Sequence, residues 1–121
     1  MGSKFKVPSV QQYKDALAKI NMTEGQKAML LFHLEAPNRM AEFAELSAAA
    51  GKKGSYANRW YGGLGQKIGK EIGVEFAQYV KGDWFSSAIG RSDWQGKTLR
   101  LVMHDELAKA IEQTIIEKGG L

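Results

Sequence analysis

The densest cluster of chemically capable side chains lies in residues 52–70, KKGSYANRWYGGLGQKIGK. This segment holds five basic residues, three aromatic residues and no acidic residue, whereas the whole chain has 17 Lys and Arg against 13 Asp and Glu. Its positive charges therefore exceed the net charge of +4 of the entire chain. Positive charge interleaved with aromatic and polar side chains is typical of a surface that binds nucleic acid. A solvated basic helix without a partner has the same composition, so the neighbouring elements must distinguish the two.

Two kinds of side chain in this segment suit a DNA duplex. Asn58 has the chemistry to pair with adenine and Arg59 with guanine, and Ser55 and Tyr56 stand beside them at the start of a predicted helix. A recognition helix reads base edges with its N-terminal residues, so these four are candidate base-reading residues. Phosphate contacts give affinity without sequence information, and the candidates for them are Lys52, Lys53, Lys67 and Lys70.

The composition is that of one globular domain. The chain has 121 residues, of which 44% are hydrophobic and 25% charged, and it contains no cysteine. Disulfides and thiolate metal sites are therefore excluded, and no apolar run approaches the roughly 20 residues that span a bilayer. We expect a cytoplasmic protein with no membrane association, a single domain over 9–118, and a disordered N-terminus or cloning remnant over 1–8.

The apolar spacing predicts five helices. Val10, Tyr13, Leu17 and Ile20 recur at intervals of three and four, and Ser9 with Gln12 forms a capping box ahead of them. A second capping box at Thr23 and Gln26 precedes an apolar helix that ends before Pro37. The remaining helices are expected at 41–50, 55–72 and 105–117, with Gly51 as a left-handed stop and the Ser55 hydroxyl as an N-cap.

A β-hairpin is predicted between the last two helices. Residues 84–89 and 98–103 are rich in aromatic and branched side chains, and we expect them to pair as antiparallel strands. The polar, glycine-bracketed loop 90–97 would then present several contact groups at its tip, namely Arg91, Ser92, Trp94, Gln95 and Lys97. The predicted fold is α+β: a mostly helical winged helix-turn-helix with a two-stranded hairpin wing and a C-terminal helix. A helical 84–89, or a lack of this pairing, would defeat the winged-helix interpretation.

Four glycines inside the predicted 55–72 helix require a reason. Each costs roughly 0.8–1.0 kcal/mol relative to alanine in a helix interior. The two explanations are close packing of neighbouring backbone, or a bend or break of the helix near Gly62 and Gly63. Trp60, Tyr61 and Trp84 are expected in or near the core, whereas Trp94 is left open as a core or contact residue.

Catalytic constellations are missing from the sequence pattern. The only histidines are His33, expected to be a hydrogen-bonded structural residue, and His104, expected at a helix start. They share no motif that would indicate a metal site or a general base. The glycines of 63–69 have the wrong spacing for a dinucleotide fingerprint, and no strand precedes them. We therefore expect no enzyme activity, no metal and no cofactor.

Several segments resemble a bacterial winged-helix-like module found alone or attached to HNH-type nuclease domains in defence-related, restriction-associated proteins. LFHLEAPNR at 31–39, FAEL at 43–46 and ANRWYGGLG at 57–65 carry the resemblance, together with Trp84 and residues 101–110. It implies a recognition role in which Asn58, Tyr61 and Gly62 occupy the signature positions, and these residues have structural explanations as well. Met40 and Ala41 stand where the family tends to have a threonine cap, and no histidine-rich nuclease motif is present.

The sequence thus predicts a non-catalytic domain that binds double-stranded DNA through helix 55–72 and the wing 90–97. The main alternative is a protein-interaction module on the same scaffold, an adaptor or an inhibitor of a defence nuclease. A charge of +4 is mild for a DNA-binding protein, and an acidic protein would also suit the basic helix.

Overall fold

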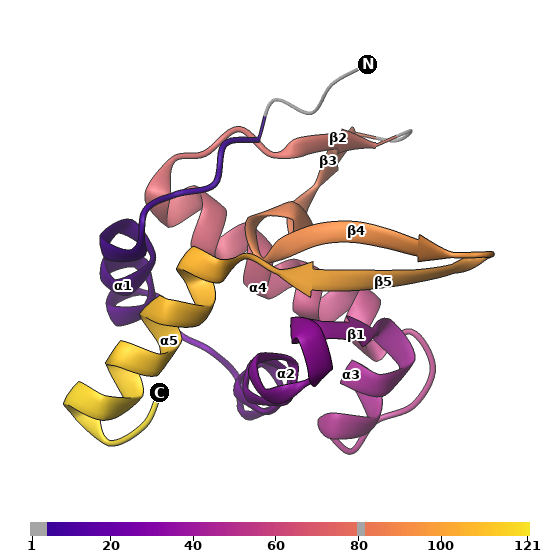
Figure 1. The fold of residues 1–121 in the computed structure, drawn as a ribbon, viewed down its shortest axis with the longest axis horizontal. Coiled ribbons are helices and arrows are strands. Elements are labelled where there is room, and N and C mark those ends of the chain that lie inside the picture. The colour runs from indigo at the N-terminus through magenta and orange to yellow at the C-terminus, as the bar shows by residue number, and fades with distance from the viewer. Residues whose placement is uncertain (1–4, 80–81) are drawn as a thin grey trace.

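The protein is an α+β fold in which helices surround a small antiparallel sheet (Figure 1). The structure is a computed structural model, and it describes residues 5–79 and 82–121. The α-helices in these ranges are α1 (Val10–Lys19), α2 (Glu24–Glu35), α3 (Phe43–Ala49), α4 (Tyr56–Ile72) and α5 (Asp105–Lys118). The predicted helices are therefore confirmed with small shifts of their ends. None of the described helices is long and apolar enough to cross a bilayer.

The predicted helix starts and stops are mostly confirmed. Both capping boxes are formed, and the side-chain oxygens of Gln12 and Gln26 accept hydrogen bonds from the backbone N–H groups of Ser9 and Thr23. Gly51 has a left-handed φ of 73°, as its role as a stop for α3 requires. The predicted disorder over 1–8 concerns in part residues 1–4, which lie outside the described residues. In the described remainder, the Phe5 ring stacks on His104 with centroids 5.3 Å apart.

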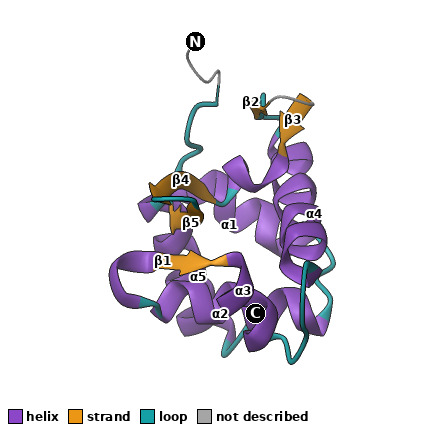
Figure 2. Cartoon of the chain, turned by 90° about the vertical axis from the view of Figure 1, so that its right-hand side faces the viewer, coloured by secondary structure: helices purple, strands orange, loops and turns teal. Residues whose placement is uncertain are grey.

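A strand that the sequence did not reveal precedes α3. Met40–Glu42 forms β1, which pairs antiparallel with β5 (Thr98–Met103), and β5 pairs in turn with β4 (Gly90–Gln95). The sheet order is β1-β5-β4. Figure 2 shows β1 between the hairpin and the α2–α3 pair. Because β1 occupies residues 40–42, α3 begins at Phe43 rather than at the predicted Ala41.

The predicted strand over 84–89 is wrong. Residues Phe85–Ala88 form a 3₁₀ helix, which follows the short pair β2 (Ala77–Tyr79) and β3 (Gly82–Trp84). The Ser87 hydroxyl explains the difference, because it donates to the Trp84 carbonyl at 2.6 Å and accepts from the Ala77 N–H at 3.1 Å. The hairpin is made by the next segment instead, and β4 uses residues that the sequence assigned to the loop.

Helix α4 is buried along one side, and two of its glycines permit that burial. A Cβ at Gly65 would overlap the Phe85 carbonyl, and one at Gly69 would overlap the Phe76 ring. Close packing is therefore the right explanation for these two positions. The alternative of a break at Gly62 and Gly63 is wrong, since α4 is continuous over Tyr56–Ile72.

His33 has the structural role that the sequence predicted. Its ring is fully buried, with Nδ1 2.8 Å from the Tyr61 hydroxyl and Nε2 2.8 Å from the Leu101 carbonyl. A carbonyl only accepts, so Nε2 donates to Leu101 and Nδ1 accepts from Tyr61 in the neutral ring. Burial lowers the pKa of His33, which keeps the ring neutral. One side chain thus joins α2, α4 and β5.

Candidate nucleic-acid interface

The start of α4 is fixed by a serine from the preceding helix. The Ser47 hydroxyl is buried, accepts from the Ala57 N–H at 2.9 Å and donates to the Gly54 carbonyl at 3.3 Å. It satisfies one of the free N–H groups at the start of α4 and ties α3 to α4. The prediction that Ser55 caps this helix is wrong, because its side chain makes no capping hydrogen bond. Ser55 lies exposed on the first turn.

Four cations along α4 and the turn before it are exposed and unpaired. Lys52, Lys53, Arg59 and Lys70 have no carboxylate within ion-pair distance in the part of the chain that the structure describes. We call these four residues the basic face. Asn58 is also exposed, and no hydrogen bond of its side chain is found among the described residues. Most of the predicted base-reading and phosphate-binding groups are thus accessible on α4 and the turn before it. Tyr56 and Lys67 are partly buried.

The aromatic residues near the basic face are only partly available. Tyr56 is half-buried and lies so close to Gly25 of α2 that a Cβ there would overlap its hydroxyl. Trp60 is 38% exposed, so its expected place in the core is wrong. Both rings hold cations, since Lys52 lies 5.8 Å from the centroid of Tyr56 and Arg59 lies 5.4 Å from that of Trp60. Tyr56 therefore serves mainly to dock α4 on α2 and to steady Lys52.

The other aromatic residues assigned to the core are found there. Tyr61 is completely buried, and Trp84 packs against the core as a partly buried residue.

Lys67 is partly buried and hydrogen-bonded to other parts of the chain, unlike the other lysines of the segment. Its ammonium group donates to the Asn21 carbonyl at 2.6 Å and to the Gln26 side-chain oxygen at 3.0 Å. Gln26 is buried as well, and its amide donates to the Trp60 carbonyl at 2.9 Å. Sequence reasoning identified Gln26 only as a capping residue and missed that it links α2 to α4. Whether a lysine of this segment is free or hydrogen-bonded depends on tertiary contacts, which the spacing of residues in the sequence does not indicate.

The hairpin does not gather its predicted contact residues at one tip. Arg91 lies opposite Val102 at the inner part of the β4–β5 pair, whereas the turn is at Gly96 and Lys97. Successive side chains of a strand point to opposite faces, so Arg91 and Trp94 lie on opposite faces of the hairpin. Trp94 is 54% exposed and is the open contact candidate. Ser92, Gln95 and Lys97 are exposed too, but Gln95 accepts from Arg100 at 2.6 Å.

A depression beside α4 is lined by three of the predicted DNA-binding residues, Arg59, Lys67 and Lys70. Its volume is about 440 Å³, and it is lined by Arg59, Trp60, Gly63, Gln66, Lys67 and Lys70 of α4 and by Gln26 of α2. Three of these residues are cations and none is acidic. The depression is therefore suited to an anionic group.

The histidines and carboxylates do not assemble into a catalytic group. Among the described residues, no set of three or more His, Cys, Asp or Glu could hold a metal ion. His104 precedes α5 without a capping hydrogen bond from its side chain, and its Nε2 lies 2.8 Å from the Ser87 carbonyl. Burial lowers the pKa of His104, and nearby Arg91 acts in the same direction.

Comparisons of the chain with protein-family models, curated proteins and solved structures find no significant match. The resemblance to the winged-helix-like module consequently stays a prediction.

Proposed function

We propose that the chain is a non-catalytic winged-helix domain that binds double-stranded DNA through the exposed side of α4. The N-terminal residues Ser55, Asn58 and Arg59 would face base edges, and Lys52, Lys53 and Lys70 would contact phosphates. Trp94 and Lys97, near the turn of the hairpin, would form a smaller second contact. This role assigns less to the hairpin than the sequence did, because Arg91 lies away from its tip.

The order of elements supports the winged-helix assignment. A three-stranded sheet in the order β1-β5-β4, with β1 ahead of a helix pair and the hairpin after it, is the arrangement expected of a winged helix. The predicted pairing of 84–89 with 98–103 is not formed, so the winged-helix interpretation that was built on it failed. The assignment depends instead on β1 and β4, which pair with the two sides of β5, a strand formed at the predicted residues 98–103.

The single observation that carries the DNA proposal is that none of the four cations of the basic face has a carboxylate within ion-pair distance among the described residues. Five cations elsewhere in the described chain do pair with carboxylates, namely Lys14, Lys19, Lys27, Arg39 and Arg100. Unpaired charge on α4 and the turn before it creates a positive potential that attracts a polyanion, and counterion release then supplies affinity.

An anisotropy titration with a short random-sequence duplex tests the proposal. Three phosphate contacts, one for each of Lys52, Lys53 and Lys70, predict a log–log salt slope of about −2.7, measured between about 50 and 200 mM salt. The duplex should stay intact when Mg²⁺ is added. If the chain binds no duplex at about 50 mM salt, DNA recognition is wrong.

A protein-interaction module is the second candidate, and one observation favours it. Leu31 and Phe32 are adjacent on α2 and are 39% and 40% exposed. Large apolar side chains side by side on a surface are a common feature of protein interfaces. An acidic partner would then engage the basic face, and a salt-dependent pull-down without duplex binding would support this candidate.

A further inference from the structure

The depression beside α4 is lined by a glycine, Gly63, that internal packing does not require. Gly62, the residue before it, is partly buried as Gly63 is. A Cβ at Gly62 would come no closer than 3.8 Å to another group, and one at Gly63 no closer than 3.7 Å. Neither glycine has a left-handed φ. Alanine would therefore fit at both positions and would favour the helix.

The other two glycines of α4 provide the contrast. A Cβ at Gly65 or Gly69 would overlap Phe85 or Phe76, so those positions are glycine because of internal packing. Internal packing gives no such reason at Gly62 and Gly63. The missing side chains leave the α4 backbone uncovered between Arg59, one turn before, and Gln66, one turn after.

The groups around this bare backbone determine which ligand it suits. Arg59, Lys67 and Lys70 bring positive charge, and Gln66 and Gln26 bring amides. The Arg59 guanidinium lies over the Trp60 ring, which restricts where its donors point. Lys67 is already bonded to Asn21 and Gln26, so the cations with free donors are Arg59 and Lys70.

We propose that this depression seats the sugar–phosphate backbone of one DNA strand, which passes over Gly63 between Arg59 and Lys70. The inference rests on the proposed function and adds to it the position of one strand on the helix. Lys70 contacts a phosphate of this strand, Arg59 reaches past the strand toward the base edges, and the absence of side chains at 62 and 63 lets the strand approach α4 closely. A side chain added at Gly63 stabilises the helix and blocks the strand.

Two substitutions of different size at Gly63 test the seat in the full chain. Gly63→Ala should raise the Tm by about 3–6 °C, because alanine is the better helix former. It should nevertheless weaken binding to the random-sequence duplex. Gly63→Leu should weaken it further, by about ten-fold at the salt concentration where the wild type binds. Gly120→Leu adds the same bulk outside α4, at a position where a Cβ would meet nothing within 4 Å, and should leave the affinity unchanged.

Salt dependence then distinguishes blocking of the strand from a general disturbance. In the wild-type background, Lys70→Gln and Lys53→Gln should each make the salt slope shallower by about one unit. In the Gly63→Leu background, Lys70→Gln should have little further effect, whereas Lys53→Gln should keep its full effect. Wild-type affinity in both Gly63 variants would overturn the seat and leave DNA binding standing. A wild-type chain that binds no duplex would instead overturn the proposed function itself.

Discussion

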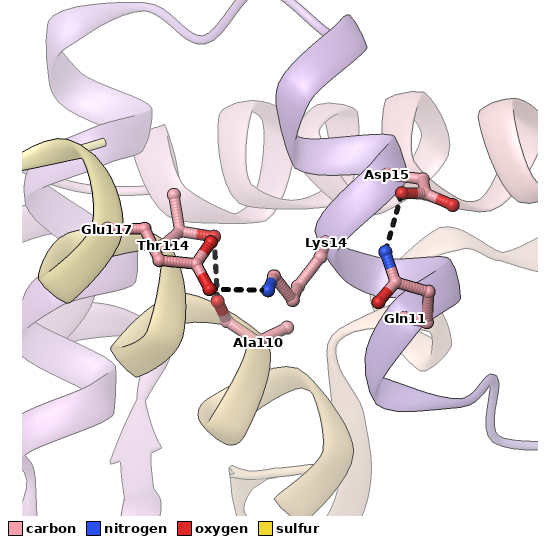
Figure 3. Close-up of polar contacts among 6 residues, drawn as sticks. All are labelled: Gln11, Lys14, Asp15, Ala110, Thr114 and Glu117. Carbon is pink, nitrogen blue, oxygen red and sulfur yellow. Dashed lines mark hydrogen bonds and ion pairs between the residues drawn. The ribbon is translucent and has the colours of Figure 1, made fainter.

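The exposed side of α4 and the α1–α5 face carry lysines in opposite surroundings. On the α1–α5 face, Lys14 Nζ lies 2.9 Å from a Glu117 carboxylate oxygen, and Gln11 donates to Asp15 at 2.8 Å (Figure 3). On α4 and the turn before it, Lys52, Lys53 and Lys70 have no such partner within the described ranges. The same residue type thus joins two helices in one region and is left unneutralised in the other.

The comparison separates charges that organise the fold from charges that remain available to a ligand. Exposed ion pairs contribute only about 0–1 kcal/mol, so the α1–α5 pair adjusts helix packing rather than determining it. Unpaired like charges close together repel each other and weaken the fold slightly. A cluster that persists without acids therefore suggests a partner that supplies the negative charge.

The largest expected effect comes from neutralising the basic face. Lys52, Lys53 and Lys70 changed together to glutamine should make the log–log salt slope of duplex binding shallower by about three units, because three counterion-releasing contacts are lost. Anisotropy titrations at several salt concentrations measure this slope. The loss should be nearly equal for all duplex sequences, since phosphate contacts carry no sequence information.

Lys14→Gln is the matched control, because it removes one lysine from the other region. It should leave the salt slope unchanged and lower the free energy of unfolding by at most about 1 kcal/mol. A slope change in the Lys14 variant that is one third of the change in the triple variant, and so equal per lysine removed, would mean that only net charge matters and that the two regions do not differ in binding.

A smaller effect, confined to preferred sequences, is expected at the start of α4. Arg59→Ala and Asn58→Ala should each cost about 1–3 kcal/mol at a preferred site and relax discrimination there. Competition with randomised duplexes measures the change. The Asn58 side chain makes no hydrogen bond within the described chain, so the Asn58→Ala variant should keep the wild-type Tm. A fall in Tm would indicate a structural role and remove Asn58 from the reading surface.

Lys67 provides the sharpest comparison, because it lies in the basic segment but is bonded like a structural residue. Lys67→Gln should lower the free energy of unfolding by about 0.5–1.5 kcal/mol, since its hydrogen bonds to Asn21 and Gln26 are altered. The salt slope should change by less than the one unit expected for Lys70→Gln. A full unit of change with wild-type stability would place Lys67 among the phosphate contacts after all.

The sequence predicted those parts of the fold that local chemistry decides. Capping boxes at Ser9 and Thr23 and the glycine stop at Gly51 need only near neighbours, and all are formed. Strand β1 has three residues and exists because β5, about 60 residues later, pairs with it. The 3₁₀ helix at 85–88 depends on Ser87 bonding to Ala77 and Trp84. Such distant partners leave no periodic pattern.

The candidate site follows the same division. The presence of unpaired cations on α4 was predictable from the composition of 52–70, because that segment contains no acid. The separation of Lys67 from the other lysines was not predictable, since Asn21 and Gln26 come from another part of the chain. The placement of Arg91 was wrong because the first hairpin strand lies six residues later than predicted, which turned a presumed loop residue into an inner strand residue.

The smallest expected effect is the pH dependence of stability that arises from the two histidines. Burial lowers the pKa of His33 and of His104 below the ordinary value of 6.5, so the folded chain binds fewer protons than the unfolded chain below that pH. Their contribution to stability is complete above pH 6.5 and declines as the pH falls below it. The wild-type Tm should therefore be lower at about pH 5.5 than at about pH 7.5. His33→Gln removes the titrating group while keeping a donor and an acceptor, so its Tm should differ less between the two pH values. An undiminished difference in His33→Gln would assign the pH dependence to His104 or to the carboxylates, and His104→Gln, measured in the same way, distinguishes these two sources.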